Sequence, residues 1–167
     1  NEKIRFGLSY TRRIQRPNFD QLNPQRFYID VNTSALGNPD IKPQYGHHIS
    51  ATIGISRHFN LNIFGQLFDN VITQSPSIDQ QTGEKLMTWD NFGKLSMRGI
   101  NASLTEYSVY KWLTINIYGS VSNVNTSGKD YSASRIFTSA NFNAAFNLPN
   151  DLKIELNGWG QSGIPYG

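Results

Sequence analysis

Apolar and polar residues alternate along most of the chain, so that every second residue is apolar. The pattern is clear near the start, where Ile4, Phe6, Leu8 and Tyr10 alternate with polar residues and glycine. A period of two predicts strands with one apolar face and one polar face. It recurs in about seven segments, at residues 3–10, 49–56, 61–68, 100–105, 113–121, 136–147 and 152–157. No segment shows the 3.6-residue period of a long helix, so the sequence predicts an all-β fold.

The connections between these predicted strands alternate in length. In order, they lie at residues 13–44, 57–59, 75–84, 109–110, 125–133 and 149–151. The first, third and fifth connections are long, and the others are short turns. Short turns at one end and long loops at the other are typical of antiparallel up-and-down barrels in outer membranes, with the long loops outside the cell.

The composition of the two predicted faces favours a lipid environment. The apolar rows contain no charged residue, and the opposite rows are mostly Ser, Thr, Asn, Gln and Gly. A cationic side chain at mid-depth on a lipid-facing strand costs about 2–4 kcal/mol, so its exclusion is expected. Charged residues make up only 16% of the chain, against about a quarter in soluble domains. We therefore predict that the apolar rows contact lipid and that the polar rows face a lumen.

Strand length and aromatic placement agree with this interpretation. Ten residues rising about 3.4 Å each, tilted by about 45°, span roughly 24 Å, close to the height of the apolar band of a barrel. Aromatic rings prefer the two membrane interfaces. They gather near both ends of the predicted strands: Phe59, Tyr107, Tyr110 and Trp112 by the short turns, and Tyr10, Tyr45, Phe68 and Trp89 by the long loops.

The number of predicted strands bears on the domain organisation. Seven strands cannot close a bacterial outer-membrane barrel, because such barrels have an even number of strands. An open sheet in lipid would also leave two edges of unpaired backbone groups. We therefore predict a single partial outer-membrane β-barrel domain over residues 1–167, which forms a continuous arc of a larger barrel.

The first long connection carries a series of motifs. A strand ending in Ser-Tyr-Thr-Arg-Arg is followed by Arg-Pro, Leu-Asn-Pro and Gly-Asn-Pro-Asp-Ile-Lys-Pro, and then by the next strand. Further motifs lie at residues 69–74, 91–94 and 147–165. In this order and spacing they resemble the late barrel region of TonB-dependent receptors and the outer-membrane β-barrel family related to them.

This resemblance implies a function and a set of partners. It implies a barrel of about 22 strands in the outer membrane of a Gram-negative bacterium, closed by an N-terminal plug. Such a receptor takes up a small nutrient, for example a siderophore or a glycan, with energy from TonB. The expected partners are the lipid bilayer, the rest of the barrel, the plug, TonB and a small-molecule ligand. An adhesin or structural barrel without transport, and a soluble β-sandwich binding module, remain as alternatives.

Two groups of residues are candidates for the functional site. The first forms an extracellular rim motif, structural or ligand-facing: Arg12, Arg13, Arg16, Pro17, Asn23, Pro24, Gly37, Asn38, Pro39, Lys42 and Pro43. The prolines fix φ, so this loop can be ordered without regular structure. The arginines can bind carbonyls and carboxylates of the rim, or alternatively an anionic ligand or lipopolysaccharide phosphates. The second group comprises lumen-facing aromatics, expected to pack on a plug or to stack on a ligand: Phe64, Phe68, Phe137 and Trp159.

The sequence gives little support for a metal site, nucleic-acid binding or catalysis. The chain has no cysteine, which excludes disulfides and thiolate metal sites. His47 and His48 are neighbours in a strand and point to opposite faces, and His58 lies at the other end, so we predict no metal site and no cofactor. Basic residues are scattered and the net charge is only +3, which does not suggest nucleic-acid binding. No Ser-His-acid or paired-acid arrangement is apparent, and the chain is not expected to be an enzyme.

Overall fold

A computed structural model describes residues 4–80, 82–128 and 131–163 of the chain. Almost all regular structure in these residues is β-strand, which confirms the predicted all-β fold. In chain order the elements are β1 (Ile4–Gln15), α1 (Phe19–Leu22), β2 (Phe27–Asp30), β3 (Thr33–Leu36), β4 (Gln44–Ile55), β5 (Phe59–Asp69), β6 (Ile72–Ile78), β7 (Lys85–Asn91), β8 (Lys94–Tyr110), β9 (Leu113–Ser127), β10 (Ser132–Asn147) and β11 (Lys153–Gln161).

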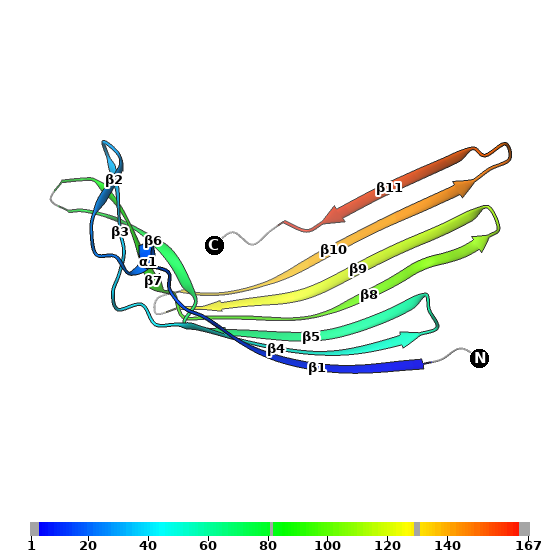
Figure 1. The fold of residues 1–167 in the computed structure, drawn as a ribbon, viewed down its shortest axis with the longest axis horizontal. Helices are drawn as coiled ribbons and strands as arrows, with labels where there is room; N and C mark the ends of the chain where they lie inside the picture. Colours follow the sequence, from blue (N-terminus) through cyan, green and yellow to red (C-terminus); the bar gives the residue numbers. More distant parts are fainter. Residues whose placement is uncertain (1–3, 81, 129–130, 164–167) are drawn as a thin grey trace.

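The long strands form one curved main sheet (Figure 1). Its seven strands are ordered β1-β4-β5-β8-β9-β10-β11, and every neighbouring pair is antiparallel. Each strand therefore lies next to the strand that follows it in this sheet, which confirms the predicted up-and-down arrangement. Short turns join the strands at one end, here called the turn end. The long connections lie at the opposite end, here called the loop end.

The register aligns like residues across the main sheet. Leu8, Ala51, Ile63, Ile100 and Val121 form one lateral row, because each is paired with the next. Since successive side chains of a strand point to opposite faces, these rows define an apolar face. The next residue on each strand belongs to the polar face, where the corresponding row is Ser9, Ser50, Phe64, Gly99 and Ser122.

The apolar face is not covered by any described segment. Phe6 and Leu8 are 77% and 80% exposed. Within the described residues, the buried apolar side chains are Ala35 and Ile41, and both lie in the first long connection. A β-sandwich requires two sheets around a shared apolar core, so the soluble-sandwich alternative is wrong.

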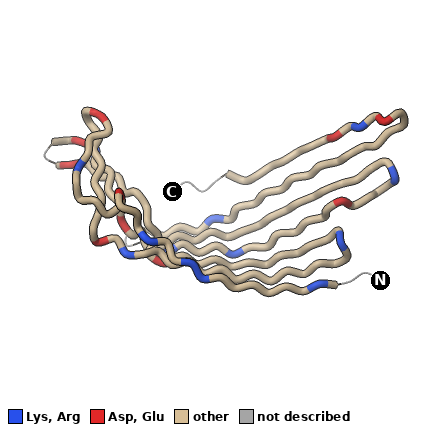
Figure 2. Tube along the Cα trace, viewed as in Figure 1, with Lys and Arg blue, Asp and Glu red and all other residues tan. Residues whose placement is uncertain are grey.

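Charged residues avoid the middle of the main sheet. Figure 2 shows Lys and Arg near the two ends of the strands, with a middle zone that is almost free of charge. Among the described residues, no helix has the length and apolar composition needed to cross a membrane.

The first and third connections of the chain fold together into a second, smaller sheet at the loop end, here called the loop sheet (Figure 1). Its order is β2-β3-β7-β6, and the central pair, β3 and β7, is parallel. The expectation that the first loop lacks regular structure is therefore wrong. Two segments far apart in sequence satisfy each other's backbone N–H and C=O groups by pairing. The loop also contains the short helix α1, where Asn18 and Gln21 form a reciprocal capping box.

Candidate binding site at the loop end

The two halves of the predicted rim motif meet inside the first long connection. The amide of Gly37 donates to the carbonyl of Asn23 at 2.9 Å, and the amide of Asn38 donates to the carbonyl of Gln21 at 2.7 Å. A Cβ atom at Gly37 would lie 2.7 Å from the carbonyl oxygen of Asp20 and closer still to the backbone of Asn23. Glycine is therefore required for this approach of two backbone segments.

Side chains from both connections attach this loop to the β6–β7 hairpin. Asn91 pairs with the backbone of Lys42: the Lys42 amide donates to Asn91 Oδ1 at 2.8 Å, and Asn91 Nδ2 donates to the Lys42 carbonyl at 3.0 Å. Asn38 Nδ2 donates to the carbonyl of Trp89 at 3.1 Å. The motif residues Asn38 and Lys42 thus hold the loop sheet together.

Arg26 connects the first loop to the tip of the hairpin. Its guanidinium lies 3.6 Å from a carboxylate oxygen of Asp79 and 3.6 Å from one of Glu84. A side-chain hydrogen bond with Tyr28, and to a smaller extent the interaction with Asp79, raise the pKa of Arg26. Asp79 and Glu84 lie in the connection between β6 and β7, in which residue 81 is outside the described residues.

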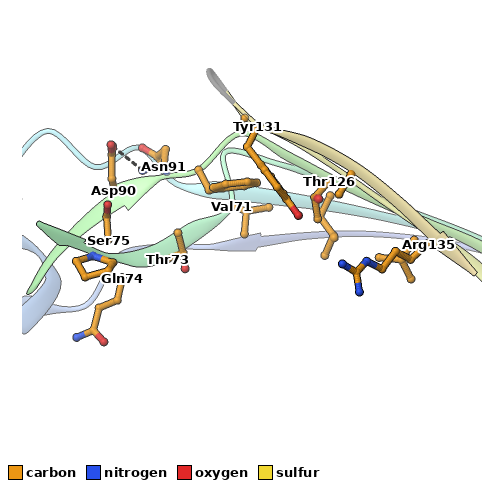
Figure 3. Close-up of a pocket in the computed structure, with 15 residues that line it drawn as sticks. Val71, Thr73, Gln74, Ser75, Asp90, Asn91, Thr126, Tyr131 and Arg135 are labelled. Carbon is orange, nitrogen blue, oxygen red and sulfur yellow. Dashed lines mark hydrogen bonds between the residues drawn. The ribbon is translucent and has the colours of Figure 1, made fainter. Parts of the chain in front are cut away.

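A hollow of about 710 Å³ lies between the β6–β7 hairpin and the polar face of the main sheet (Figure 3). Its floor comes from two lateral rows of β8, β9 and β10, one with Leu95, Thr126 and Ala133 and the next with Val124 and Arg135. The hairpin and its flanks contribute Val71, Thr73, Gln74, Ser75, Pro76, Asp90, Asn91 and Phe92. The β6–β7 part of the loop sheet therefore lies over the polar face of the main sheet.

The lining of the hollow combines aromatic surface with hydrogen-bonding groups. Figure 3 shows Tyr131 between Val71 and Thr126, with the guanidinium of Arg135 extending from β10 on the same side of the sheet. The ring of Tyr131 meets that of Phe92 edge to face, with centroids 6.2 Å apart. The volume lies within the range of about 300–1,000 Å³ that is usual for small-molecule pockets. Such a lining suits a polar molecule that also offers a flat or apolar surface.

A comparison with protein-family models decides the identity of the fold. The model of the outer membrane protein beta-barrel family matches residues 1–166. The chain belongs to this family. It therefore lies in the outer membrane of a Gram-negative bacterium, as predicted, with the apolar face toward lipid and the polar face toward the lumen of the barrel.

A solved structure supports the barrel architecture. The siderophore receptor PirA from Pseudomonas aeruginosa superimposes with a TM-score of 0.78 at 16% sequence identity, over 97% of this chain. The aligned region is 31% of the PirA chain, so the chain described here spans about a third of the length of that receptor. The search of curated proteins found no match.

The predicted lumen aromatics lie on the lumen face but are not brought together. Phe64 and Phe137 share one lateral row, separated by the small residues Gly99 and Ser122. The ring of Phe68 covers Gly46, where an added Cβ would lie 2.9 Å from it. On β11, Trp159 is 79% exposed. None of the four predicted aromatics lines the hollow, and their role toward a plug or a ligand remains a prediction.

The three motif arginines are not brought together in the structure. Arg12 and Arg13 belong to β1 rather than to the loop, and neighbours in a strand point to opposite faces. Arg12 lies on the lipid face, 5.4 Å from the ring centroid of Tyr45. Arg13 is paired with Gly46 on the lumen face, and Arg16 follows the end of the strand. The prolines Pro17, Pro24, Pro39 and Pro43 lie in the loop as expected.

The histidines are also separated. His47 and His48 lie on opposite faces of β4, and His58 is at the turn end, where its Nδ1 is 2.9 Å from the carbonyl of Thr105. In the parts of the chain that the structure describes, no group of three or more His, Cys, Asp or Glu residues is placed to hold a metal ion.

Sequence reasoning missed the residues that line the hollow. One signal was available, because Arg135 lies two residues before Phe137 and so shares its face of β10. Thr73, Asp90 and Tyr131 had no such signal. Thr73 and Asp90 line the hollow because the β6–β7 hairpin folds back over the main sheet, whereas Tyr131 lies in the connection directly before β10.

Proposed function

We propose that this chain is a barrel segment of a receptor that takes up a small nutrient, and that the hollow at the loop end contacts that nutrient. The observation that carries the proposal is the position of the hollow. It lies on the lumen face, at the extracellular mouth, beneath loops held in place by many side-chain contacts. A molecule entering the barrel from outside meets this surface first.

The chemistry of the lining supports a siderophore or a glycan as the class of nutrient. Both offer many hydroxyl or carbonyl groups, which match the donors of Tyr131 and Arg135 and the acceptor of Asp90. Sugars and aromatic chelates also stack on aromatic rings, which Phe92 and Tyr131 provide. The fold similarity to a siderophore receptor agrees with this choice.

The proposal includes parts of the protein that these residues do not supply. We propose that a plug fills the lumen, that TonB supplies the energy, and that the protein transports rather than catalyses. A purely structural barrel would need no such ligand surface at the mouth.

Uptake assays in the source bacterium test the proposal. Cells that lack the gene are complemented with the wild-type protein, Tyr131→Ala or Arg135→Gln. They then receive panels of iron-loaded siderophores or of oligosaccharides as the sole source of iron or carbon. We expect one panel to identify a nutrient whose uptake needs the gene and falls at least about tenfold in both variants, since each loses interactions with a buried ligand.

The matched control is Asn141→Ala, on the lumen face of β10 outside the hollow. This variant should transport normally. If deletion of the gene leaves every nutrient unaffected while cell adhesion or envelope integrity is lost, the protein is an adhesin or a structural barrel instead.

A further inference from the structure

The lipid face changes from apolar to polar within two lateral rows. The row of Leu8, Ala51, Ile63, Ile100 and Val121 is wholly apolar. Toward the loop end the next row on the same face is Tyr10, Ile49, Gly65, Arg98 and Asn123, and the row after it is Arg12, His47, Leu67, Ser96 and Asn125. This change places a charged and amide-rich zone directly beside the hydrocarbon-facing surface.

A groove of about 540 Å³ lies in this boundary zone. Gly65 forms its floor, because a strand residue without a side chain leaves a gap between its neighbours. Ile49 and Leu67 add apolar surface. The hydroxyl of Tyr10 is 2.9 Å from Nδ1 of His47, and this pair borders one side of the groove.

Polar groups border the other side. Ser96, Arg98 and Asn125 line it from β8 and β9. Asn125 Nδ2 donates to Asn123 Oδ1 at 2.6 Å, and Asn123 Nδ2 donates to Ser134 Oγ at 3.1 Å. These contacts hold the amides of the patch in a fixed arrangement.

The charge of Arg98 is not neutralised by a protein carboxylate. Arg98 is exposed, and no ion pair to it exists among the described residues. The nearest acid on this face, Asp69, lies 3.4 Å from Lys94 and is paired there. A guanidinium on the lipid side of a barrel is costly near the hydrocarbon, so its position at the polar edge calls for an anionic partner.

We infer that this groove binds the phosphate-bearing headgroup of an outer-leaflet lipid, which is lipopolysaccharide in a Gram-negative outer membrane. The planar guanidinium of Arg98 suits bidentate contact with phosphate oxygens. Hydrogen-bond donors from Ser96 and the Tyr10–His47 pair lie around the same groove. The acyl chains of the lipid then run over Ala51 and Ile63 in the apolar row below. This inference concerns the lipid face and is independent of the uptake proposal.

A binding experiment on the purified, folded protein tests the inference. The protein is stripped of lipid in an uncharged detergent, and its folding is checked by heat-dependent migration on a gel. It is then titrated with lipopolysaccharide, with enzymatically dephosphorylated lipopolysaccharide and with inorganic phosphate, and binding is followed by native mass spectrometry. We expect lipopolysaccharide to bind about ten- to a hundredfold more tightly than its dephosphorylated form, as for hydrogen bonds to a charged group.

The variants separate the groove from the rest of the barrel. Arg98→Gln should lose that ten- to hundredfold preference, while Arg135→Gln, a cation at a similar height on the lumen face, should keep it. Gly65→Leu fills the groove and should weaken binding, whereas Gly119→Leu, on the same face with nothing within 4 Å of an added Cβ, should not.

Several results would overturn the inference. Binding by Arg98→Gln within twofold of the wild type would do so. Equal losses in Gly65→Leu and Gly119→Leu would show that any bulky residue on the lipid face has this effect. Inorganic phosphate that binds as tightly as the lipid would mean that the groove is a site for free anions.

Discussion

Replacing Gly37 with alanine tests whether a close backbone approach orders the extracellular rim. The added methyl group would lie 2.7 Å from the carbonyl oxygen of Asp20 and would overlap the backbone of Asn23. Neither group can move away as a flexible side chain would. The two segments must therefore separate, which breaks the hydrogen bonds from Gly37 to Asn23 and from Asn38 to Gln21.

The expected loss of stability in the loop follows from the broken hydrogen bonds and from the steric clash of the added methyl group. Each backbone hydrogen bond contributes about 0.5–1.5 kcal/mol, and forcing a methyl group into a packed site costs about 1–3 kcal/mol. Because separation relieves the clash, the two costs overlap, and we expect the local opening free energy to fall by about 2–4 kcal/mol. Since about 1.4 kcal/mol corresponds to a factor of ten, amide exchange in the loop should accelerate by roughly 30- to 1,000-fold.

Hydrogen exchange measured by mass spectrometry on the purified barrel in detergent provides the assay. Peptides covering residues 33–43 report the loop, and peptides from β9 and β10 report the main sheet. Gly119→Ala is the control, because an added Cβ there has nothing within 4 Å. The reasoning is refuted if Gly37→Ala leaves exchange in the loop within threefold of the wild type, or if the control has the same effect.

Three further predictions concern other parts of the chain. Asn91→Ala removes two side-chain hydrogen bonds to the backbone of Lys42, of 2.8 and 3.0 Å, and one of 2.9 Å to the Asn70 carbonyl. The loss of the first two should weaken docking of the first loop by about 1–3 kcal/mol, seen as faster exchange of that loop. Ala51→Arg places a cation on the lipid face and should cost about 2–4 kcal/mol, measured by urea unfolding in vesicles, whereas Ser50→Arg on the lumen face should cost little. The Asn32 amide donates to Asp30 Oδ1 at 2.7 Å, which lowers the pKa of Asp30. Its stabilisation of the β2–β3 turn is therefore present at neutral pH and lost as the pH falls through that lowered pKa, and Asp30→Asn should remove this pH dependence of exchange at the turn.

Each of these predictions has a contrary outcome. Unchanged loop exchange in Asn91→Ala would mean that the parallel β3–β7 pairing alone holds the loops. Equal destabilisation by the two arginine substitutions would contradict the assignment of faces. If exchange at the β2–β3 turn still depends on pH in Asp30→Asn, a titratable group other than Asp30 causes that dependence.

The main sheet was predictable because lipid imposes a strict period of two on each strand. β8 is the instructive exception, since its sequence is the least regular. Leu104 is paired with Ile117 and Tyr107 with Ile115, so three steps on β8 match two on β9. This bulge, in which Glu106 has a φ of 50°, returns Tyr107 to the lipid face. Its extra residue interrupts the alternation of apolar and polar residues, so the sequence of β8 does not show a regular period of two.

The loop sheet was not predictable, because its defining contact is not local. β3 and β7 are four and seven residues long, and nothing in either segment indicates that they pair in parallel across some fifty residues of sequence. The motif with Gly37 and Asn38 correctly marked a rim element. It did not show that its partners are the backbone of Asn23 and the β6–β7 hairpin, and the side of the hollow that this hairpin forms depends on that docking.

The register of β8–β10 couples the two proposed surfaces of this barrel. On β8, Leu95 lines the proposed ligand hollow and Ser96 lines the lipid groove, and on β9 Val124 and Asn125 alternate in the same way, so the two surfaces are built on alternate residues of the same strands. A slip by one residue would exchange them, moving Arg98 into the lumen and the lumen side chains into hydrocarbon. The short turns prevent this, because turn type and loop length fix the register of a hairpin. In the turn after β10, the Leu148 amide donates to the Leu152 carbonyl across a loop in which Asn150 and Asp151 adopt positive φ angles of 62° and 58°. The conformation of residues at the turn end therefore fixes which side chains face the lumen and which face the lipid at the opposite, loop end.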